Sequence, residues 1–238
     1  MITLENTEVL GWEAAIRGMR NPMNSWERSD TVFLGEDYDG YNLQGDAFPA
    51  PNEIHAKGLE LGDNDHKLMI NLAKAGSVDA KYRRMIVVTV DITAPLYWWK
   101  EFDTYKVGTV ANSCSTMHKI HAKEFTLDDF SCEHLLNKYG DPSMNLSYGQ
   151  KYPLAILQDI IYALNRFREE YIYTKDKSYW WQMIQLLPSS YNQRRTVMLN
   201  YEVLAGIYPK RKNHKLDEWH DFCGWIKRLP YSEIITLE

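Results

Sequence analysis

A dense run of small polar side chains in the middle of the chain is the first candidate for chemistry. The central segment (residues 95–117) reads PLYWWKEFDTYKVGTVANSCSTM: an aromatic stretch, a glycine, then hydroxyl, amide and thiol side chains. Such a run can bring backbone N–H groups and short donors close to a phosphate or a pyrimidine ring. An ordinary polar loop that caps a helix beginning near Ser113 also explains this composition. The segment alone suggests a nucleotide site and no more.

Cys114 is the candidate nucleophile of this segment. Lys106 and His118 lie nearby in sequence, and a cationic neighbourhood favours the thiolate that would attack C6 of a pyrimidine. The bland alternative is a small buried hydrophobe, because free cysteine is among the most buried residue types. A zinc set is a rival reading, but its spacing matches no tight template and we predict no metal. Its ligands would be Cys114, His118, His121, Cys132 and His134.

Paired tryptophans and a short basic run are further candidates. Trp98-Trp99 and Trp180-Trp181 could stack on a flavin or a base, but large aromatic side chains at helical spacing are usually core, and we predict core for both pairs. Arg211 stands in Lys210-Arg211-Lys212, where the alternative to an anion-binding role is a solvated surface cluster.

These residues need a scaffold, which periodicity and turn signals predict as alternating helices and one clear strand. The strand covers 85–93 (MIVVTVDIT), and a short aromatic helix follows Pro95 and ends near 103–108. Apolar stripes at helical spacing predict the other elements. Those helices cover 65–75, 153–173, 178–187, 196–207 and 217–228.

Composition limits the class of protein. The 238 residues, 45% of them hydrophobic, show no linker or repeat, so we predict a single domain over 1–238. A net charge of -5 argues against a polynucleotide partner and leaves room for a small nucleotide. Neither a signal peptide nor a membrane span is visible, which predicts a cytoplasmic protein. Three cysteines predict reduced thiols.

The central segment resembles the signature of the flavin-dependent thymidylate synthases. In that family an Ala-Pro strand end and an aromatic helix, matched here by Ala94-Pro95 and the residues after it, precede the signature. The signature runs Arg-His-Arg, two residues, Ser, one residue, Asn-Glu, one residue, Ser, one residue, Arg-Tyr. Aligned without a gap, its positions fall in order on Thr104, Tyr105, Lys106, Thr109, Ala111, Asn112, Cys114, Thr116 and Met117. None is identical, although four keep a cation, a hydroxyl, a hydrogen-bonding head or a nucleophilic atom.

The resemblance extends along the chain. Leu187-Pro188 followed by Tyr191 is similar to the family's Leu-Pro entry to a late helix, and Asn200 falls at an asparagine that contacts flavin. Arg211 matches the arginine that grips the pyrimidine if one residue is deleted before His214; otherwise Lys210 takes that place. Upstream, 75–84 falls at the family's first flavin-contacting loop, with Arg84 beside Ser77 and Lys81 as local candidates.

The resemblance therefore implies an α/β (α+β) fold with a central, mainly antiparallel sheet flanked by helices. It implies an FAD-dependent methyltransferase of nucleotide biosynthesis, a homotetramer that moves a one-carbon unit from methylenetetrahydrofolate to C5 of dUMP with NADPH as reductant. The implied FAD contacts are Ser77, Lys81, Tyr105, Lys106, Thr109, Asn112 and Asn200. The implied dUMP contacts are Glu101, Thr104, Cys114, Ser115, Thr116, Lys210 and Arg211, with Arg211 and Cys114 as catalytic residues.

Two alternatives remain open because the Arg-His-Arg cluster is absent. An arginine fork grips a phosphate with a geometry that threonine cannot supply and lysine supplies only as a point charge. The chain could therefore be a relative that binds a nucleotide without flavin chemistry, or one that modifies a nucleotide through Cys114. A fold does not carry an activity by itself.

Overall fold

The computed structural model describes residues 2–34, 54, 56, 58–137 and 151–238. The chain forms two compact units. Unit 1 comprises Thr93–Asp103 and Ser113–Arg195, and unit 2 comprises Ile2–Ile92, Thr104–Asn112 and Thr196–Glu238. The prediction of a single domain stays a prediction.

The main sheet is antiparallel and has four strands in the order β1-β4-β6-β5. Its strands are β1 Thr3–Leu10, β4 Val87–Pro95, β5 Val110–Ser113 and β6 Asn192–Asn200. Strand β4 buries every second side chain, from Val88 to Ala94, as expected for a β-branched strand that covers a core with one face. A small antiparallel pair joins β2 (Val32–Phe33) to β3 (Leu59–Glu60). The predicted mainly antiparallel sheet with flanking helices is confirmed.

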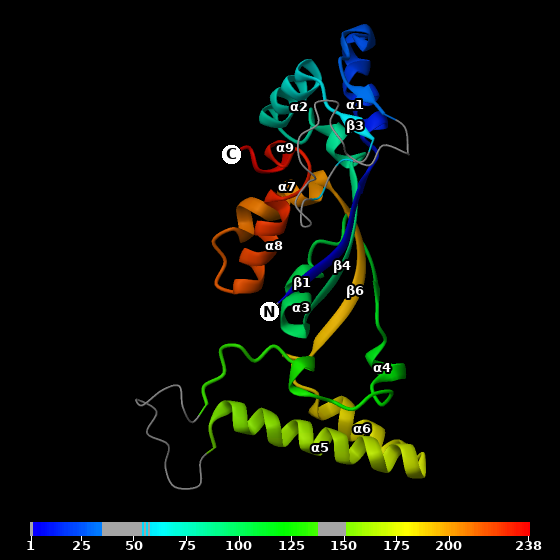
Figure 1. Ribbon diagram of the computed structural model, residues 1–238, viewed down its shortest axis with the longest axis vertical. Coiled ribbons are helices and arrows are strands. Elements are labelled where there is room, and N and C mark those ends of the chain that lie inside the picture. Colours follow the sequence, from blue (N-terminus) through cyan, green and yellow to red (C-terminus); the bar gives the residue numbers. More distant parts are fainter. Residues whose placement is uncertain (1, 35–53, 55, 57, 138–150) are drawn as a thin grey trace. The chain divides into compact units, whose positions relative to one another are not determined.

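Unit 2 packs its helices around a core rich in aromatic side chains. Trp12, Tyr201 and Tyr231 meet edge to face, with ring centroids 5.5 and 5.4 Å apart, and the Tyr201 hydroxyl donates to the Pro230 carbonyl at 2.6 Å. Burial raises the pKa of Tyr201 well above its ordinary value. Helices α7, α8 and α9 lie together (Figure 1). The helices of unit 2 are α1 Trp12–Arg20, α2 Asp63–Ala75, α7 Tyr201–Arg211, α8 Asp217–Lys227 and α9 Glu233–Thr236, with 3-10 turns η1 Asn21–Met23, η2 Trp26–Arg28 and η3 Lys81–Arg84.

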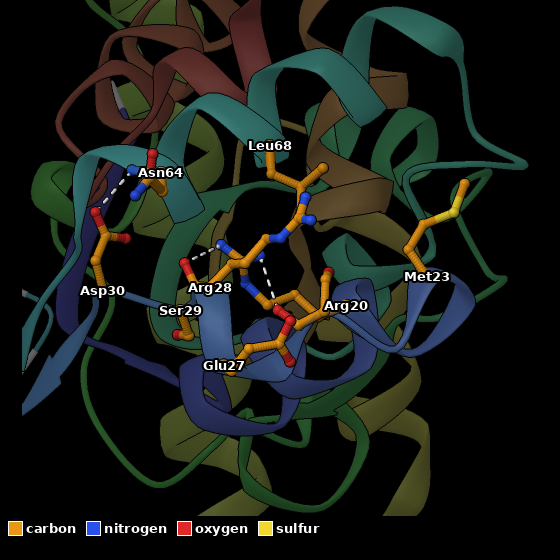
Figure 2. Close-up of a pocket in the computed structure, with 9 residues that line it drawn as sticks. Arg20, Met23, Glu27, Arg28, Ser29, Asp30, Asn64 and Leu68 are labelled. Carbon is orange, nitrogen blue, oxygen red and sulfur yellow. Dashed lines mark hydrogen bonds between the residues drawn. The ribbon is translucent and has the colours of Figure 1, made fainter.

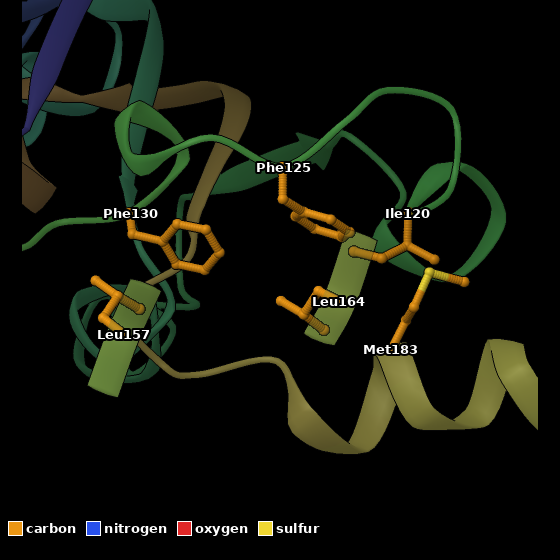
Figure 3. Packing of buried hydrophobic residues seen from close by; sticks show 6 residues of the cluster. All are labelled: Ile120, Phe125, Phe130, Leu157, Leu164 and Met183. Carbon is orange, nitrogen blue, oxygen red and sulfur yellow. The ribbon is translucent and has the colours of Figure 1, made fainter. Parts of the chain in front are cut away.

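Unit 1 is built on a long helix, α5, which packs on α6 (Figure 1). Apolar side chains from both helices and from the loop after α4 form its core, and Figure 3 shows Phe125, Leu164 and Met183 facing one another there. The Asn165 amide ties this loop to α5, since it accepts from Phe125 N and donates to Phe125 O, both at 2.8 Å. The helices of unit 1 are α3 Leu96–Phe102, α4 Thr116–Lys119, α5 Pro153–Thr174 and α6 Lys177–Leu186, with the 3-10 turn η4 Leu127–Asp129.

Most predicted elements are confirmed, and one is wrong over part of its range. The strand at 85–93 is β4, the helix after Pro95 is α3, and the helices at 65–75, 153–173, 178–187 and 217–228 are α2, α5, α6 and α8. The helix predicted at 196–207 is wrong over 196–200, because β6 continues to Asn200; the remainder, 201–207, is helical and belongs to α7, which begins at Tyr201. Within β6, Val197 and Leu199 are buried while their neighbours are not, a period of two that a short apolar run conceals.

Among the described residues, none of the helices combines the length and the apolar character that crossing a bilayer requires.

Candidate functional site

The central segment leaves α3, turns through 103–108 and forms the strand β5 before α4. All four side chains of β5 are exposed, so Asn112 projects from the surface and takes no part in a core. Gly108 has a φ of +76°, a left-handed conformation that glycine adopts without strain. A Cβ at Gly108 would lie 3.1 Å from Val203 Cγ2 and 3.2 Å from Asn200 Nδ2. The loop is therefore pressed against the first turn of α7.

Within unit 2, this contact brings two of the predicted site residues together. Arg211, at the C-terminal end of α7, donates from Nε to the Tyr105 hydroxyl at 2.8 Å. Its guanidinium carbon lies 4.4 Å from the Trp219 ring centroid and 5.5 Å from that of Tyr105. Arg211 is only half-buried, and both aromatic contacts are in the range of cation–π attraction. Lys210 and Lys212 on either side are exposed, as the alternative of a solvated surface cluster predicts, whereas the side chain of Arg211 has these specific partners.

The side-chain oxygen of Asn200 has a structural role. Its side-chain oxygen accepts a hydrogen bond from Val203 N at 3.0 Å and caps α7, which satisfies one of the unpaired N–H groups at the start of the helix. Its Nδ2 faces Gly108. Asn200 therefore fixes where the strand β6 ends, and its NH2 group takes no part in this cap.

The other predicted FAD contacts in unit 2 are spread over its surface. Ser77 lies in the turn after α2, Lys81 in η3 and Lys106 in the loop before β5, and all three are exposed. Thr109 differs, since its Oγ1 is buried and has no hydrogen-bond partner among the described residues. Lys210 is exposed, and Thr104 lies exposed beside Tyr105 in the turn.

Unit 1 holds the remaining predicted residues, with Cys114 at the end of β5. Its side chain is exposed, so the alternative of a buried, inert thiol is wrong. Two backbone contacts fix the residue: Cys114 N donates to Arg194 O at 2.9 Å, and Cys114 O accepts from Gln193 Nε2 at 3.0 Å. The thiol is therefore open to solvent on a fixed backbone, and exposure is one condition for a reactive cysteine.

The neighbours of Cys114 have mixed roles. The Ser115 hydroxyl accepts from His118 N at 3.1 Å and caps α4, while Thr116 begins that helix half-buried. Glu101 lies half-buried on α3. Of the four, Cys114 is the one whose functional atom is shown exposed and outside a cap.

The Leu187-Pro188 turn fixes the start of α3. Tyr191 N donates to Pro188 O at 3.0 Å, and Tyr191 O in turn accepts from Leu96 N at 3.0 Å. The Tyr191 ring packs on Phe130, with centroids 5.6 Å apart. Burial, with the charge of Asp129 adding to it, raises the pKa of Tyr191. Tyr191 is therefore a half-buried, neutral phenol whose backbone carbonyl fixes the start of α3.

The sequence analysis does not predict a cluster of side chains around Arg195 in unit 1. Arg195 donates to Asp103 Oδ1 at 2.7 Å and to Gln193 Oε1 at 3.0 Å, and its guanidinium carbon lies 4.1 Å from the Trp99 ring centroid. Trp99 Nε1 donates to Gln193 O at 2.9 Å. The only sign of this cluster in the sequence is the pair of adjacent arginines in NQRRT (residues 192–196).

The two tryptophan pairs differ in burial. Trp98 and Trp99 are 0% and 1% exposed, which confirms them as core. Trp181 is 43% exposed, so core is wrong for it, because α6 buries only Met183 fully and leaves its opposite side in water. The Trp180 indole donates to Met117 O at 3.1 Å and ties α6 to the end of the central segment.

A hollow of about 810 Å³ in unit 2 lies apart from these residues in the chain. Figure 2 shows Arg20, Arg28 and Asn64 around it. Its buried polar groups serve the fold: Arg20 donates to Asp65, to Ser25 O and to Arg28 O. Asp30 accepts from the N–H groups of Asn64 and Asp65 and so caps α2. We therefore do not place a site there.

The zinc alternative has no geometric support. Among the described residues, no three histidine, cysteine, aspartate or glutamate side chains come together in a way that could hold a metal ion.

Several solved structures match this chain over its whole length. Two structures of thymidylate synthase X from Helicobacter pylori, both with FAD and dUMP, cover all of this chain and 98% and 97% of theirs, with TM-scores of 0.63 and 0.61. The fold is that of the flavin-dependent thymidylate synthases. A UMP/dUMP methylase, PolB from Streptomyces cacaoi bound with 5-Br UMP, covers all of this chain and 95% of its own, with a TM-score of 0.57.

Sequence similarity is much weaker than this structural match. Identity is 14% and 13% to the two thymidylate synthase structures and 12% to PolB. No protein-family model matches the sequence, and no curated protein is significantly similar to it. The shared property is therefore the fold.

The donors in unit 2 can be compared with what FAD would need. Lys81 and Lys106 offer exposed ammonium groups, and Ser77 and Asn112 offer an exposed hydroxyl and an exposed amide. The buried Thr109 hydroxyl lacks a partner among the described residues, and buried polar groups normally have one. In charge these donors suit an anionic diphosphate, which ammonium groups bind as point charges and without the bidentate grip of a guanidinium; they come from separate elements of the unit.

Proposed function

We propose that this protein is a nucleotide-methylating enzyme of the thymidylate synthase type. It would transfer a one-carbon unit from methylenetetrahydrofolate to C5 of dUMP or a similar pyrimidine nucleotide. The observation that carries the proposal is the hydrogen bond between Arg211 and Tyr105. It joins the arginine that the resemblance assigns to the pyrimidine to a position of the rewritten signature, on a fold shared with enzymes solved with dUMP.

Arg211 would act on the pyrimidine electrostatically. Its guanidinium would stabilise the negative charge that develops on the ring, and a preorganised donor of this kind contributes about 3–4 kcal/mol in other enzymes. Lys210, Thr104, Ser115, Thr116 and Glu101 are the proposed further nucleotide contacts. Cys114, with its exposed thiol, is the proposed nucleophile if the reaction passes through an adduct at C6.

FAD is part of this proposal, with NADPH as the reductant. When bound, FAD would supply the hydride that completes the methyl group. Lys81, Lys106 and Ser77 would hold its phosphates, Thr109 and Asn112 would donate to it, and Asn200 would present its NH2 group. Tyr105 would meet FAD through its ring, since its hydroxyl accepts from Arg211.

A second candidate is a protein that binds or modifies a nucleotide without flavin. Two observations favour it: the side-chain oxygen of Asn200 is committed to the cap of α7, and Thr104 and Lys106 replace guanidinium groups. In either case we propose a homotetramer in the cytoplasm, with no polynucleotide partner.

Absorbance of the purified protein between 350 and 500 nm, before and after addition of FAD, tests the first candidate. A flavin spectrum that survives gel filtration, followed by rescue of a thymidine-requiring bacterium, would support it. A protein that neither retains nor binds FAD eliminates the first candidate, and dUMP binding measured by calorimetry then decides the second.

A further inference from the structure

An aromatic pair encloses Arg211 and comes from two segments far apart in the chain. Tyr105 belongs to the central segment and Trp219 to α8. Their rings meet edge to face, with centroids 6.1 Å apart, and the guanidinium of Arg211 contacts both of them. Trp219 is 0% exposed, so one side of the guanidinium rests on a fixed surface.

The two rings act on different parts of the guanidinium. Trp219 lies closer, with its ring centroid 4.4 Å from the guanidinium carbon, as expected for a cation on the face of an indole. The Tyr105 hydroxyl fixes the Nε edge through the 2.8 Å hydrogen bond. An arginine side chain otherwise has many rotamers, and fixing it in advance removes an entropy cost from binding.

Trp219 is itself held in place. Its ring packs edge to face on Phe222, with centroids 5.7 Å apart, and on His214 at 6.2 Å. Tyr105 depends on the loop that Gly108 presses against α7. The orientation of Arg211 is therefore set by α8 on one side and by the central segment on the other.

We propose that Tyr105 and Trp219 are positioning residues, which fix the guanidinium of Arg211 for a pyrimidine nucleotide. The inference rests on the proposed function, since it requires that Arg211 meets the nucleotide. It adds a reason for the tyrosine at position 105: its hydroxyl aligns Arg211. Neither residue needs to touch the nucleotide.

Calorimetry of the full-length protein with dUMP and with UMP tests the proposal. Tyr105→Phe removes only the hydroxyl, and Trp219→Leu removes the aromatic face. Each should weaken binding about tenfold, as expected for the loss of a hydrogen bond or cation–π contact to a charged group. The matched controls are Tyr208→Phe and Trp225→Leu, which should leave nucleotide binding unchanged. Tyr208 lies on the same helix as Arg211, and its substitution removes a tyrosine hydrogen bond to Glu238. Trp225 is a buried tryptophan of α8 that donates a hydrogen bond to Thr7.

A double-mutant cycle separates positioning from a merely structural role. In an Arg211→Ala background, Tyr105→Phe and Trp219→Leu should cause no further loss of affinity, because they act through Arg211. Binding by the single variants that equals wild type overturns the proposal, and so does a tenfold loss that persists without Arg211. Wild-type protein that binds neither nucleotide overturns the proposed function together with this inference, whereas uncoupled losses overturn the inference alone.

A readout without ligand checks the geometry. In ¹⁵N-edited NMR of the arginine side chains, the Arg211 Nε–H should exchange with water more slowly in wild type than in Tyr105→Phe. Stacking on Trp219 should shift this proton upfield, and the shift should disappear in Trp219→Leu. An Nε–H signal that neither substitution changes would contradict the proposed arrangement.

Discussion

Asp65 accepts a hydrogen bond from Arg20 Nε at 2.6 Å, in an ion pair whose side chains are 0% and 5% exposed. The same carboxylate accepts from Ser29 Oγ at 2.6 Å and from Thr31 Oγ1 at 2.7 Å. One buried group on α2 thus holds α1 and the 25–31 loop together. Removing one member of such a pair leaves a buried charge without compensation.

Asp65→Asn should therefore lower the free energy of unfolding by about 3–5 kcal/mol, measured by urea denaturation at pH 7. Glu13→Gln is the matched control, because its pair with Arg17 is exposed and should contribute less than about 1 kcal/mol. Equal effects of the two substitutions would contradict the role assigned to the buried pair.

Acid should weaken the same pair. Burial alone would raise the pKa of Asp65, but the hydrogen bonds from Ser29, Thr31 and Arg20 outweigh burial and hold the pKa below its ordinary value. A lowered folded-state pKa contributes stability above the unfolded pKa, which is lost as the pH falls through the folded one. The wild type should therefore lose stability below about pH 4, and the difference between wild type and Asp65→Asn should shrink there. A constant difference down to pH 2 would contradict this linkage.

Gly108→Ala should destabilise the protein by about 1–2 kcal/mol, the usual penalty for a left-handed L-residue, because the added Cβ also meets Val203. It should weaken nucleotide binding as well, since it moves the loop that carries Tyr105. Gly206→Ala is the control within α7: a Cβ there meets nothing within 4 Å, so the substitution should stabilise by about 0.5–1 kcal/mol. Thermal unfolding of the two variants gives the comparison. If Gly206→Ala destabilises the protein as much as Gly108→Ala does, position 108 has no special need for glycine.

Glu238 joins α7 and α8 through two lysines. Its carboxylate accepts from Lys212 at 2.8 Å and from Tyr208 at 2.9 Å, and it pairs with Lys227 at 2.9 Å. Hydrogen bonds from Lys212, Lys227 and Tyr208 lower the pKa of Glu238 to about 2. The contribution to stability is present above the unfolded pKa of about 4.3 and disappears as the pH falls through about 2.

Glu238→Gln should consequently lower the melting temperature at pH 7, and the difference from wild type should vanish near pH 2. Added salt should also reduce the difference, because the group is exposed and its interactions are screened. A melting temperature unchanged at pH 7 would show that this cluster contributes nothing measurable.

The thiols should differ sharply in reactivity. Cys114 is exposed, whereas Cys223 is 5% exposed and burial raises its pKa to about 11. With iodoacetamide at pH 8, Cys114 should alkylate in the native protein, and Cys223 only after unfolding. Peptide mass spectrometry locates the label, with Cys114→Ser as control. Native labelling of Cys223 would contradict its burial, and a nucleotide adduct that survives Cys114→Ser would exclude the thiol route.

Strong local periodicity explains which elements the sequence predicts. The β-branched run of β4 and the apolar stripe of α5 each determine their own structure, because burial on one face requires that pattern. Strand β6 lacks such a pattern, and local periodicity does not predict it. Its inward residues are few, and its end is decided by the Asn200 cap and by pairing with strands that lie far away in the chain.

The candidate site shows the same division. Arg211 and Tyr105 each follow from a resemblance at single positions, but nothing local indicates that they bond each other or that Trp219 supports them. The sequence does not predict Arg195 for the same reason, since its partners are Trp99 on α3 and Asp103 in the turn after it. Contacts between segments far apart in the chain depend on the fold, and the local pattern of the sequence does not reveal them.

The exposure of β5 has an evolutionary consequence. All four of its side chains face away from any core of the described chain, and Cys114 beyond it is exposed too. Substitutions there change what the surface offers a ligand at little cost in folding free energy, since exposed positions are usually neutral to stability. The side chains of β5 and Cys114 can thus change while the architecture persists. Selection for a new ligand would therefore change these surface positions without disturbing the packing of the core.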